Sequence, residues 1–193
     1  MSIFSKKKDK EQDILSRFGR GDARAMDVLY AEYAGYLTAV CARYVAQEED
    51  LHDVLQEALI KIFSRIASFT YQGPGSLKAW MTRIVVNEAL MFLRGRRPGL
   101  FVDTEPDDLH LVDESTEDPP DAALSADRLT QLIQQLPDGY RAVFNLYAIE
   151  GKSHKEIATM LGIRPDTSAS QYHRARAMLA RLINEERRKE ATA

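Results

Sequence analysis

Apolar side chains recur at spacings of three and four residues throughout the patterned parts of this chain. In residues 22–44 the stripe includes Leu29, Tyr33 and Leu37, and a similar stripe runs through residues 48–66. Such spacing places apolar groups on one face of an α-helix, whereas a half-buried strand alternates apolar and polar residues. No segment shows that alternation, so the chain is expected to be all-α.

Charge divides the chain into three parts. The 193 residues carry a net charge of −3, but residues 98–125 hold nine acidic residues and no Lys or Arg. The flanking blocks, residues 1–97 and 126–193, each carry a net charge of +3. Prolines and like charges disfavour a packed core in residues 98–125. We therefore expect two small helical domains joined by an acidic Pro-rich linker, which either acts as a passive tether or contacts a basic channel.

Several functional classes are excluded by absent signals. No run of 18 apolar residues could span a membrane, and the N-terminus has no apolar core of a secretory signal, so a cytoplasmic protein is expected. A single cysteine, Cys41, allows neither an internal disulfide nor a cysteine-rich zinc site. No cofactor and no metal are expected.

An enzyme is the weakest interpretation. His52 and Asp53 form a dyad like that of metal-dependent phosphohydrolases, but the other histidines, His110, His154 and His173, fall in the linker or the second domain. No Walker-type, HExxH or serine-nucleophile motif occurs. His52 is expected to be an exposed polar residue, and no catalytic residue is assigned.

Residues 153–182 carry the strongest local pattern. Ser153 is placed to cap a short helix that ends at Leu161, Gly162 permits a tight turn, and Pro165 suits the first turn of a longer helix. This is the pattern of a helix-turn-helix. The inward stripe of the longer helix is predicted to be Tyr172, Ala175, Leu179 and Leu182.

Five stretches, in order, resemble the extracytoplasmic-function (ECF) sigma factors. The stretch IEGKSHKEIATMLGIRPDTSASQYHRAR resembles their region-four helix-turn-helix, and LPDGYRAVFNLYAIEG resembles the first half of that domain. Upstream, DLHDVLQEALIKIF resembles the core-polymerase-binding helix, and SFTYQGPGSLKAWMTRIVVNEALMFLRGRRP resembles the promoter-melting segment. The opening helices of the family resemble ILSRFGRGDARAMDVLYAEYAGYLTAVCARYV.

The resemblance implies a function and three partners. The chain would direct bacterial core RNA polymerase to a specific promoter set and start transcription. Residues 1–97 would bind the polymerase and melt the minus-10 element, and residues 126–193 would read the minus-35 element. Promoter DNA and an anti-sigma factor are the other expected partners, and no direct membrane insertion is expected.

The resemblance also assigns roles to residues. Residues expected to grip core polymerase are Asp50, Asp53, Gln56, Glu57 and Lys61. Residues expected to contact the minus-10 DNA are Tyr71, Gln72, Gly73, Ser76, Lys78, Arg83, Asn87, Arg94, Arg96 and Arg97. Residues expected to contact the minus-35 DNA are Arg164, Thr167, Ser168, Ser170, Gln171, His173, Arg174 and Arg176. Hydroxyl, amide and guanidinium groups suit base edges and phosphates.

The sequence departs from the family at the start of the recognition helix. Asp166-Thr167 stands where a Gly-Thr pair is common, and Ala169 stands where a lysine is common. Both changes lower the local positive charge, so weaker minus-35 affinity is expected. Trp80 is expected to pack in the core rather than to stack on a base. A stand-alone helix-turn-helix regulator is the alternative function, although it would leave residues 1–97 without a role.

Overall fold

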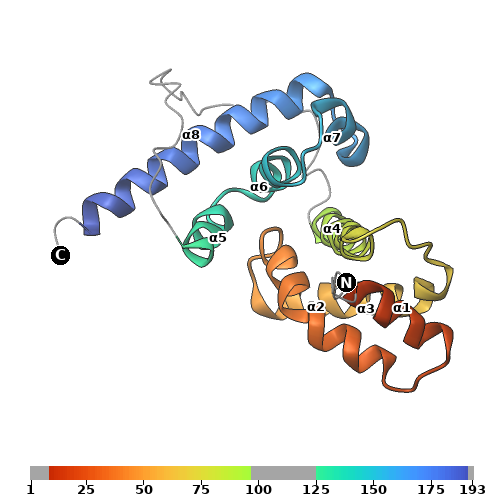
Figure 1. The fold of residues 1–193 in the computed structure, drawn as a ribbon. Helices are drawn as coiled ribbons and strands as arrows, with labels where there is room; N and C mark the ends of the chain where they lie inside the picture. Colours follow the sequence, from red (N-terminus) through yellow and green to blue (C-terminus); the bar gives the residue numbers. More distant parts are fainter. Residues whose placement is uncertain (1–8, 97–124, 191–193) are drawn as a thin grey trace, which may run out of the picture. The chain divides into compact units, whose positions relative to one another are not determined.

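The computed structural model describes residues 9–96 and 125–190, and within these ranges the regular elements are helices without any strand (Figure 1). The predicted all-α class is thereby confirmed. The chain divides into two units, residues 1–41 with 47–89 and residues 42–46 with 90–193. None of the helices in the described ranges is long and apolar enough to cross a membrane.

The first unit is built on helices whose apolar stripes face one another. They are α1 (Lys10–Gly19), α2 (Ala25–Ala42), α3 (Glu48–Arg65), the short 3₁₀ helix η1 (Ile66–Ser68) and α4 (Ser76–Arg96). The last residue of α2 and residues 90–96 of α4 are grouped with the second unit. Leu29, Leu37, Ile62, Leu77 and Met81 are fully buried and form its core. Helix α3 begins at Glu48, where the apolar stripe of residues 48–66 begins, and α4 begins at Ser76.

The second unit holds the helix-turn-helix. Its elements are α5 (Ala126–Gln134), α6 (Asp138–Phe144), the π-helix η2 (Asn145–Ile149), α7 (His154–Leu161) and α8 (Pro165–Glu190). Leu132 and Ile133 of α5, with Leu136 just after that helix, pack with Ala175, Leu179 and Ile183 of α8. Helix α6 continues directly into η2, where the helical turn is widened to a π-helix.

A buried guanidinium joins α5 to α6. Arg141 donates hydrogen bonds to the carbonyls of Gln134, at 2.8 Å, and Leu136, at 3.0 Å, and to the Asp138 carboxylate at 2.5 Å. These acceptors include backbone groups that the end of a helix leaves without intrahelical partners. The side chain thus stabilises the turn between the two helices.

The turn of the helix-turn-helix has the predicted boundaries. Gly162 ends α7 in the left-handed conformation, with φ of 72°, and its N–H donates to the carbonyl of Ala158. A residue with a Cβ is disfavoured at this φ. Ile163 follows as a buried residue, and α8 begins at Pro165 as expected.

Candidate nucleic-acid and polymerase interfaces

One face of α4 carries three of the ten residues predicted to contact minus-10 DNA. Arg83, Asn87 and Arg94 are exposed, and their spacings of four and seven place them on the same side of the helix. Met91, 56% exposed, lies between Asn87 and Arg94 on this side. The face combines cationic, amide and apolar groups, which together suit phosphates and an unstacked base.

Trp80 begins the same side of α4 but is only half-exposed. Its ring packs against Phe69, with the ring centroids 5.1 Å apart. The contact agrees with the expectation that Trp80 serves packing. Because part of the ring reaches the surface, Trp80 also extends the apolar part of the α4 face.

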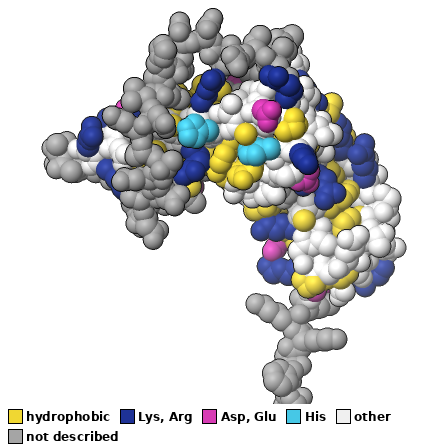
Figure 2. Space-filling model, turned by 90° about the horizontal axis from the view of Figure 1, so that it is seen from above, with side chains coloured by type: hydrophobic (Ala, Val, Ile, Leu, Met, Phe, Trp, Pro, Cys, Tyr) yellow, Lys and Arg dark blue, Asp and Glu magenta, His cyan; other side chains and the backbone are white. Residues whose placement is uncertain are grey.

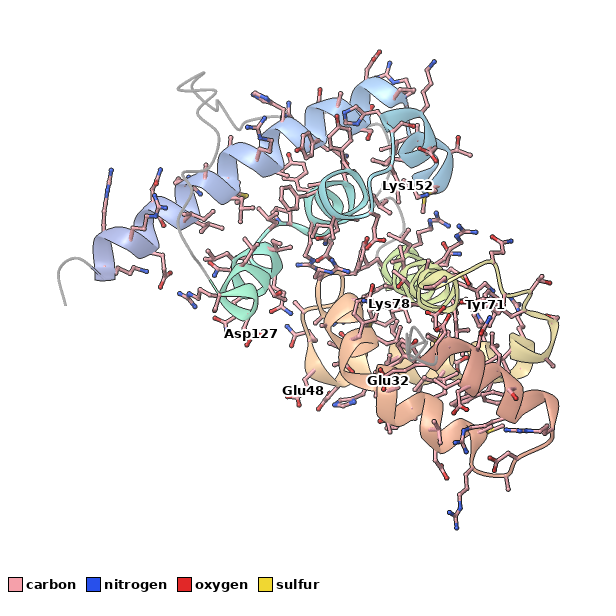
Figure 3. All side chains as sticks on the ribbon, in the orientation of Figure 1. Glu32, Glu48, Tyr71, Lys78, Asp127 and Lys152 are labelled. Atoms are coloured by element: carbon pink, nitrogen blue, oxygen red, sulfur yellow. The ribbon has the colours of Figure 1, made fainter. Side chains whose placement is uncertain are left out.

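The loop before α4 is held by side chains. The Tyr71 hydroxyl donates to the Asp9 carboxylate at the start of α1, and this hydrogen bond raises the pKa of Tyr71 to about 12. The Gln72 N–H donates to the Ser76 hydroxyl at 3.2 Å, which closes the loop on itself. Gly73 adopts φ of 127°, which side-chain-bearing residues rarely adopt. Tyr71 and Lys78, at the two ends of this segment, are labelled in Figure 3.

Lys78 has a neighbour that the sequence did not suggest. Its exposed ammonium lies over the ring of Tyr36, 3.9 Å from the centroid, in a cation–π contact. The Tyr36 hydroxyl is itself 3.1 Å from the Thr82 hydroxyl. Lys78 was predicted to hold a phosphate of the DNA. The contact with the Tyr36 ring orients the ammonium group that would bind this phosphate. Arg96 is exposed at the end of α4, and Arg97 lies outside the described residues.

The predicted polymerase-binding face of α3 is exposed in part. Asp53, Gln56 and Glu57 are exposed, and Asp50 is half-buried. Lys61 differs from them because its ammonium pairs with Glu88 of α4 at 2.5 Å. Lys61 therefore also ties α3 to α4. His52 is 69% exposed, as the sequence indicated, and lies 3.9 Å from the Glu48 carboxylate.

The helix-turn-helix presents a mixed set of its predicted DNA-facing residues. Arg164, Ser170 and His173 are exposed, and Thr167, Arg174 and Arg176 are half-buried. The exposed Asp166 lies in the first turn of α8, where its negative charge suits the positive end of the helix dipole. The same charge would oppose a phosphate at that helix start, and the weaker minus-35 affinity stays a prediction.

Ser168 and Gln171 require a correction. Both were expected to face DNA, but Ser168 is fully buried and Gln171 is 8% exposed. They stand seven and four residues before Ala175, so they share its face of α8, which packs against α7. The inward stripe therefore starts one helical turn earlier than predicted, and Tyr172 is displaced to its edge.

The Ser168 hydroxyl is held by an aromatic cluster at the start of α7. It lies 3.0 Å from Nδ1 of His154, whose ring stacks on Tyr147 with the centroids 4.4 Å apart. The ring of Tyr147 also contacts the ring of Tyr172, with the centroids 4.3 Å apart. These contacts join η2, α7 and α8, so Ser168 serves the packing of the helix-turn-helix.

Two acidic residues near the start of α1 escaped the sequence analysis. Glu11 is 5% exposed and accepts hydrogen bonds from the backbone N–H groups of Leu77, at 3.1 Å, and Lys78, at 3.0 Å. Asp9 accepts from Tyr71, as described above. No local sequence pattern predicts these contacts, because the partners lie more than 60 residues away along the chain.

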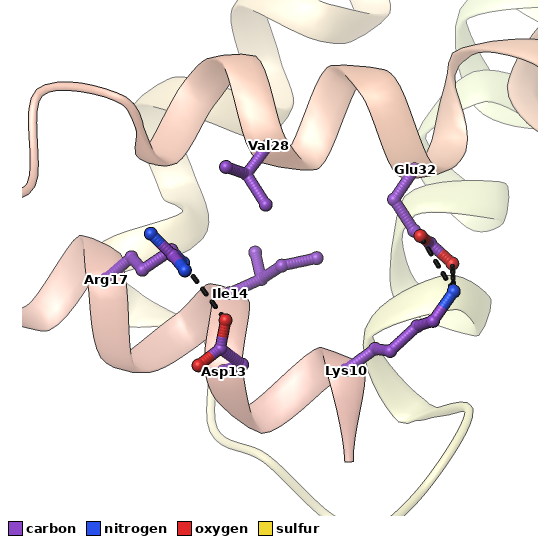
Figure 4. A pocket seen from close by; sticks show the side chains of 6 residues that line it. All are labelled: Lys10, Asp13, Ile14, Arg17, Val28 and Glu32. Atoms are coloured by element: carbon purple, nitrogen blue, oxygen red, sulfur yellow. Dashed lines mark hydrogen bonds and ion pairs between the residues drawn. The ribbon is translucent and has the colours of Figure 1, made fainter. Parts of the chain in front are cut away.

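A pocket of about 370 Å³ opens between α1 and α2 (Figure 4). Its charged walls pair with each other, Lys10 with Glu32 at 2.7 Å and Arg17 with Asp13 at 3.0 Å. None of the predicted site residues lines it.

Lys and Arg side chains reach the surface of the protein at many points, as the dark blue patches of Figure 2 show. Phosphate contacts from such groups supply salt-sensitive affinity for nucleic acid. Among the residues that the structure describes, no group of three or more His, Cys, Asp or Glu side chains is placed to hold a metal ion.

Two family models match the chain in the order of its units. Residues 29–98 match sigma-70 region 2, and residues 126–179 match sigma-70 region 4. The RNA polymerase sigma-H factor of Pseudomonas aeruginosa is 32% identical over 184 residues, which cover 91% of this chain and 94% of that protein. The ECF RNA polymerase sigma-E factor of Haemophilus influenzae is 31% identical over 182 residues, with 90% and 95% covered.

Solved structures give two further similarities. CnrH in complex with the cytosolic domain of CnrY has a TM-score of 0.49 and 24% identity, covering 92% of this chain and 99% of that chain. The sigma factor RpoE in complex with the anti-sigma factor NepR, from Bartonella quintana, has a TM-score of 0.48 and 22% identity, covering 84% and 98%.

Proposed function

The chain belongs to the extracytoplasmic-function family of RNA polymerase sigma factors and directs RNA polymerase, and we propose that its two units divide this work. Residues 1–97 bind core polymerase and open the minus-10 element, residues 98–125 link the units, and residues 126–193 read the minus-35 element. The protein acts in the cytoplasm and contributes binding energy rather than catalytic groups, so it is not an enzyme.

The exposed face of α4 is the observation that carries the proposal for residues 1–97. Along that face Asn87 stands between Arg83 and Arg94 in sequence, and the Arg94 guanidinium donates to the carbonyl of Met160. An extruded base needs polar contacts to its edge and an apolar or aromatic surface for its ring. Asn87 supplies the first, and Met91 with the exposed part of Trp80 supplies the second. Arg83 and Arg94 hold the phosphates on either side.

The proposed polymerase contact is the acidic and amide face of α3. Asp50, Asp53, Gln56 and Glu57 lie at spacings of three and one, on a helix whose opposite face is buried by Leu51, Val54, Leu55, Ala58 and Ile62. Lys61 contributes to this surface from its ion pair with Glu88. Acidic side chains presented in this way suit a basic partner surface and steer its approach.

The proposed minus-35 contact is the exposed start of α8. Arg164, Thr167, Ser170, His173, Arg174 and Arg176 are the predicted residues that the structure leaves wholly or partly accessible. A recognition helix reads base edges in the major groove from its N-terminal residues. Ser168 and Gln171 are left out of this surface because their side chains pack inside the domain.

An anti-sigma factor is part of the proposal through family membership. Such a partner would mask the α3 and α4 surfaces or the start of α8 until it is released. A stand-alone regulator is not favoured, because the match to sigma-70 region 2 accounts for the first unit, which that alternative leaves without a role.

Reconstituted transcription tests the proposed function. The purified chain would be added to sigma-free bacterial core polymerase with fragmented DNA from its own genome, and the transcript starts would be sequenced. Discrete starts that share paired upstream elements are expected. Without such starts, and without co-elution with core polymerase, the sigma-factor proposal fails, and specific binding to duplex DNA would then indicate a stand-alone regulator.

Asn87→Ala is the variant that tests the α4 face. Loss of a hydrogen bond to the extruded base is expected to reduce transcription from the mapped starts about tenfold. The matched control is Asn184→Ala, an exposed asparagine on α8 beyond the region-4 match. Equal activity of the two variants would remove Asn87 from the minus-10 contact.

A further inference from the structure

Two carboxylates at the beginning of α1 reach across the first unit to the segment proposed to capture the minus-10 strand. Asp9 caps its own helix, because its Oδ1 accepts from the Glu11 N–H at 3.0 Å. Its Oδ2 accepts from the Tyr71 hydroxyl on the loop before α4. Glu11 is the second residue of α1. Its carboxylate accepts hydrogen bonds from the backbone N–H groups of Leu77 and Lys78 at the start of α4.

The first turn of α4 depends on Glu11 for its hydrogen bonding. A helix leaves its first four N–H groups without intrahelical acceptors. In α4 the Ser76 N–H reaches the carbonyl of Gly73, at 3.1 Å, and the Ala79 N–H reaches that of Gly75, at 2.9 Å. The N–H groups of Leu77 and Lys78 both donate to the Glu11 carboxylate. Its negative charge also suits the positive end of the α4 dipole.

Glu11 is itself held in place by α2. The Tyr33 hydroxyl donates to Glu11 Oε1 at 3.4 Å, and burial together with the nearby Glu11 charge raises the pKa of Tyr33 to about 12. Ile14, 2% exposed, anchors the next turn of α1 in the core. The ion pair between Lys10 and Glu32 adds a surface contact between the same two helices. These contacts with α2 and the core therefore hold the Glu11 carboxylate in a fixed position against α4.

From these contacts we propose that Asp9 and Glu11 are positioning residues for minus-10 capture. Neither touches DNA. Asp9 sets the direction of the Tyr71 ring, and Glu11 sets the direction of the first turn of α4, from which Lys78 projects and along which Asn87 follows. The inference rests on the proposed function and adds to it the residues that prearrange the capturing loop.

A double-mutant cycle between Asp9 and Tyr71 tests the loop contact. Asp9→Ser keeps a good helix cap but removes the oxygen that Tyr71 reaches, and Tyr71→Phe removes only the hydroxyl. The full chain with core polymerase would be assayed on a mapped promoter by permanganate reactivity of unpaired minus-10 thymines. Each single variant is expected to lower promoter opening about fivefold, and the double variant no further.

Glu11→Gln tests the contact to α4. The isosteric amide presents an NH₂ group to one of the two backbone donors, so only one hydrogen bond survives. Promoter opening is expected to fall about tenfold, while the affinity for core polymerase stays within about twofold of wild type. Glu32→Gln is the control, since it removes a surface ion pair of α1 without changing the loop or α4.

The outcomes separate this inference from the proposed function. If the wild-type chain opens no promoter, the proposed function fails. If the wild type opens promoters and the variants match it, or if the Asp9 and Tyr71 effects simply add, the positioning role is wrong. A parallel loss of polymerase affinity and promoter opening in Glu11→Gln would also overturn it, because the defect would then extend to the whole unit.

Discussion

Helix α4 begins at the segment proposed to capture the minus-10 strand, and α7 precedes the helix proposed to read the minus-35 element, but the first turns of α4 and α7 are stabilised in opposite ways. In α7 the Ser153 hydroxyl accepts from the Glu156 N–H at 3.3 Å, and the Glu156 carboxylate accepts from the Ser153 N–H at 2.9 Å. This is a capping box made within four residues. In α4 the equivalent carboxylate is Glu11, which comes from another helix.

The difference bears on how each unit prepares for its ligand. A local cap forms whenever its own segment is helical, so the start of α7 needs little help from the rest of its unit. The start of α4 is complete only when α1 has docked, because Leu77 and Lys78 otherwise lose their acceptor. The segment proposed to capture a strand is thereby coupled to the folding of the whole first unit.

The largest expected effect is that of Glu11→Ala. Removing the carboxylate leaves the N–H groups of Leu77 and Lys78 without that acceptor, and Leu77 is fully buried. We expect the free energy of unfolding to fall by about 3 kcal/mol. Urea denaturation followed by circular dichroism would measure the loss.

Its control is Glu32→Ala, which removes an exposed ion pair from the same helix pair. The expected loss is about 0.5 kcal/mol or less, since surface ion pairs contribute little. Similar losses in the two variants would mean that the cap from α1 matters no more than a surface contact.

An intermediate effect on stability is expected at Gly162, the glycine that ends α7. Gly162→Ala puts a Cβ on a residue with φ of 72°, which should destabilise the protein by about 1 kcal/mol. Gly35→Ala is the matched control, because Gly35 is exposed inside α2 with open space where the new methyl group would lie. That change should instead stabilise by about 0.5 kcal/mol. Thermal melts of the two variants that shift in the same direction would contradict this assignment.

The smallest expected effect is the pH dependence of the stability contributed by Glu156. Hydrogen bonds from the backbone and hydroxyl of Ser153 lower the pKa of Glu156 below its ordinary value of 4.5. The ionised carboxylate is therefore favoured in the folded state, so its contribution is present above about pH 4.5 and is lost as the pH falls further. Glu156→Gln should lower the melting temperature at pH 7, and its difference from the wild type should shrink as the pH falls from 4.5 towards 3. A difference that is constant across this range would show that the charge is not involved.

Local patterns predicted the helix boundaries in the helix-turn-helix. Ser153, Gly162 and Pro165 each act through their own backbone and nearest neighbours, so the limits of α7 and the start of α8 could be predicted from the sequence. The faces of α8 were harder. Ser168 and Gln171 are polar, and polarity alone suggests a surface, but the packing of α7 against α8 buries both.

By itself, the sequence determined the all-helical class and the order of the two units, because helical periodicity and caps depend on residues within one or two turns. Its resemblance to known sigma factors identified the family. Only the tertiary structure decided that Lys61 pairs with Glu88, that Ser168 meets His154, and that Glu11 caps α4. The physical reason is distance along the chain. These hydrogen bonds and ion pairs join groups that only packing brings together. The residues between the partners carry no pattern from which the contacts could be predicted.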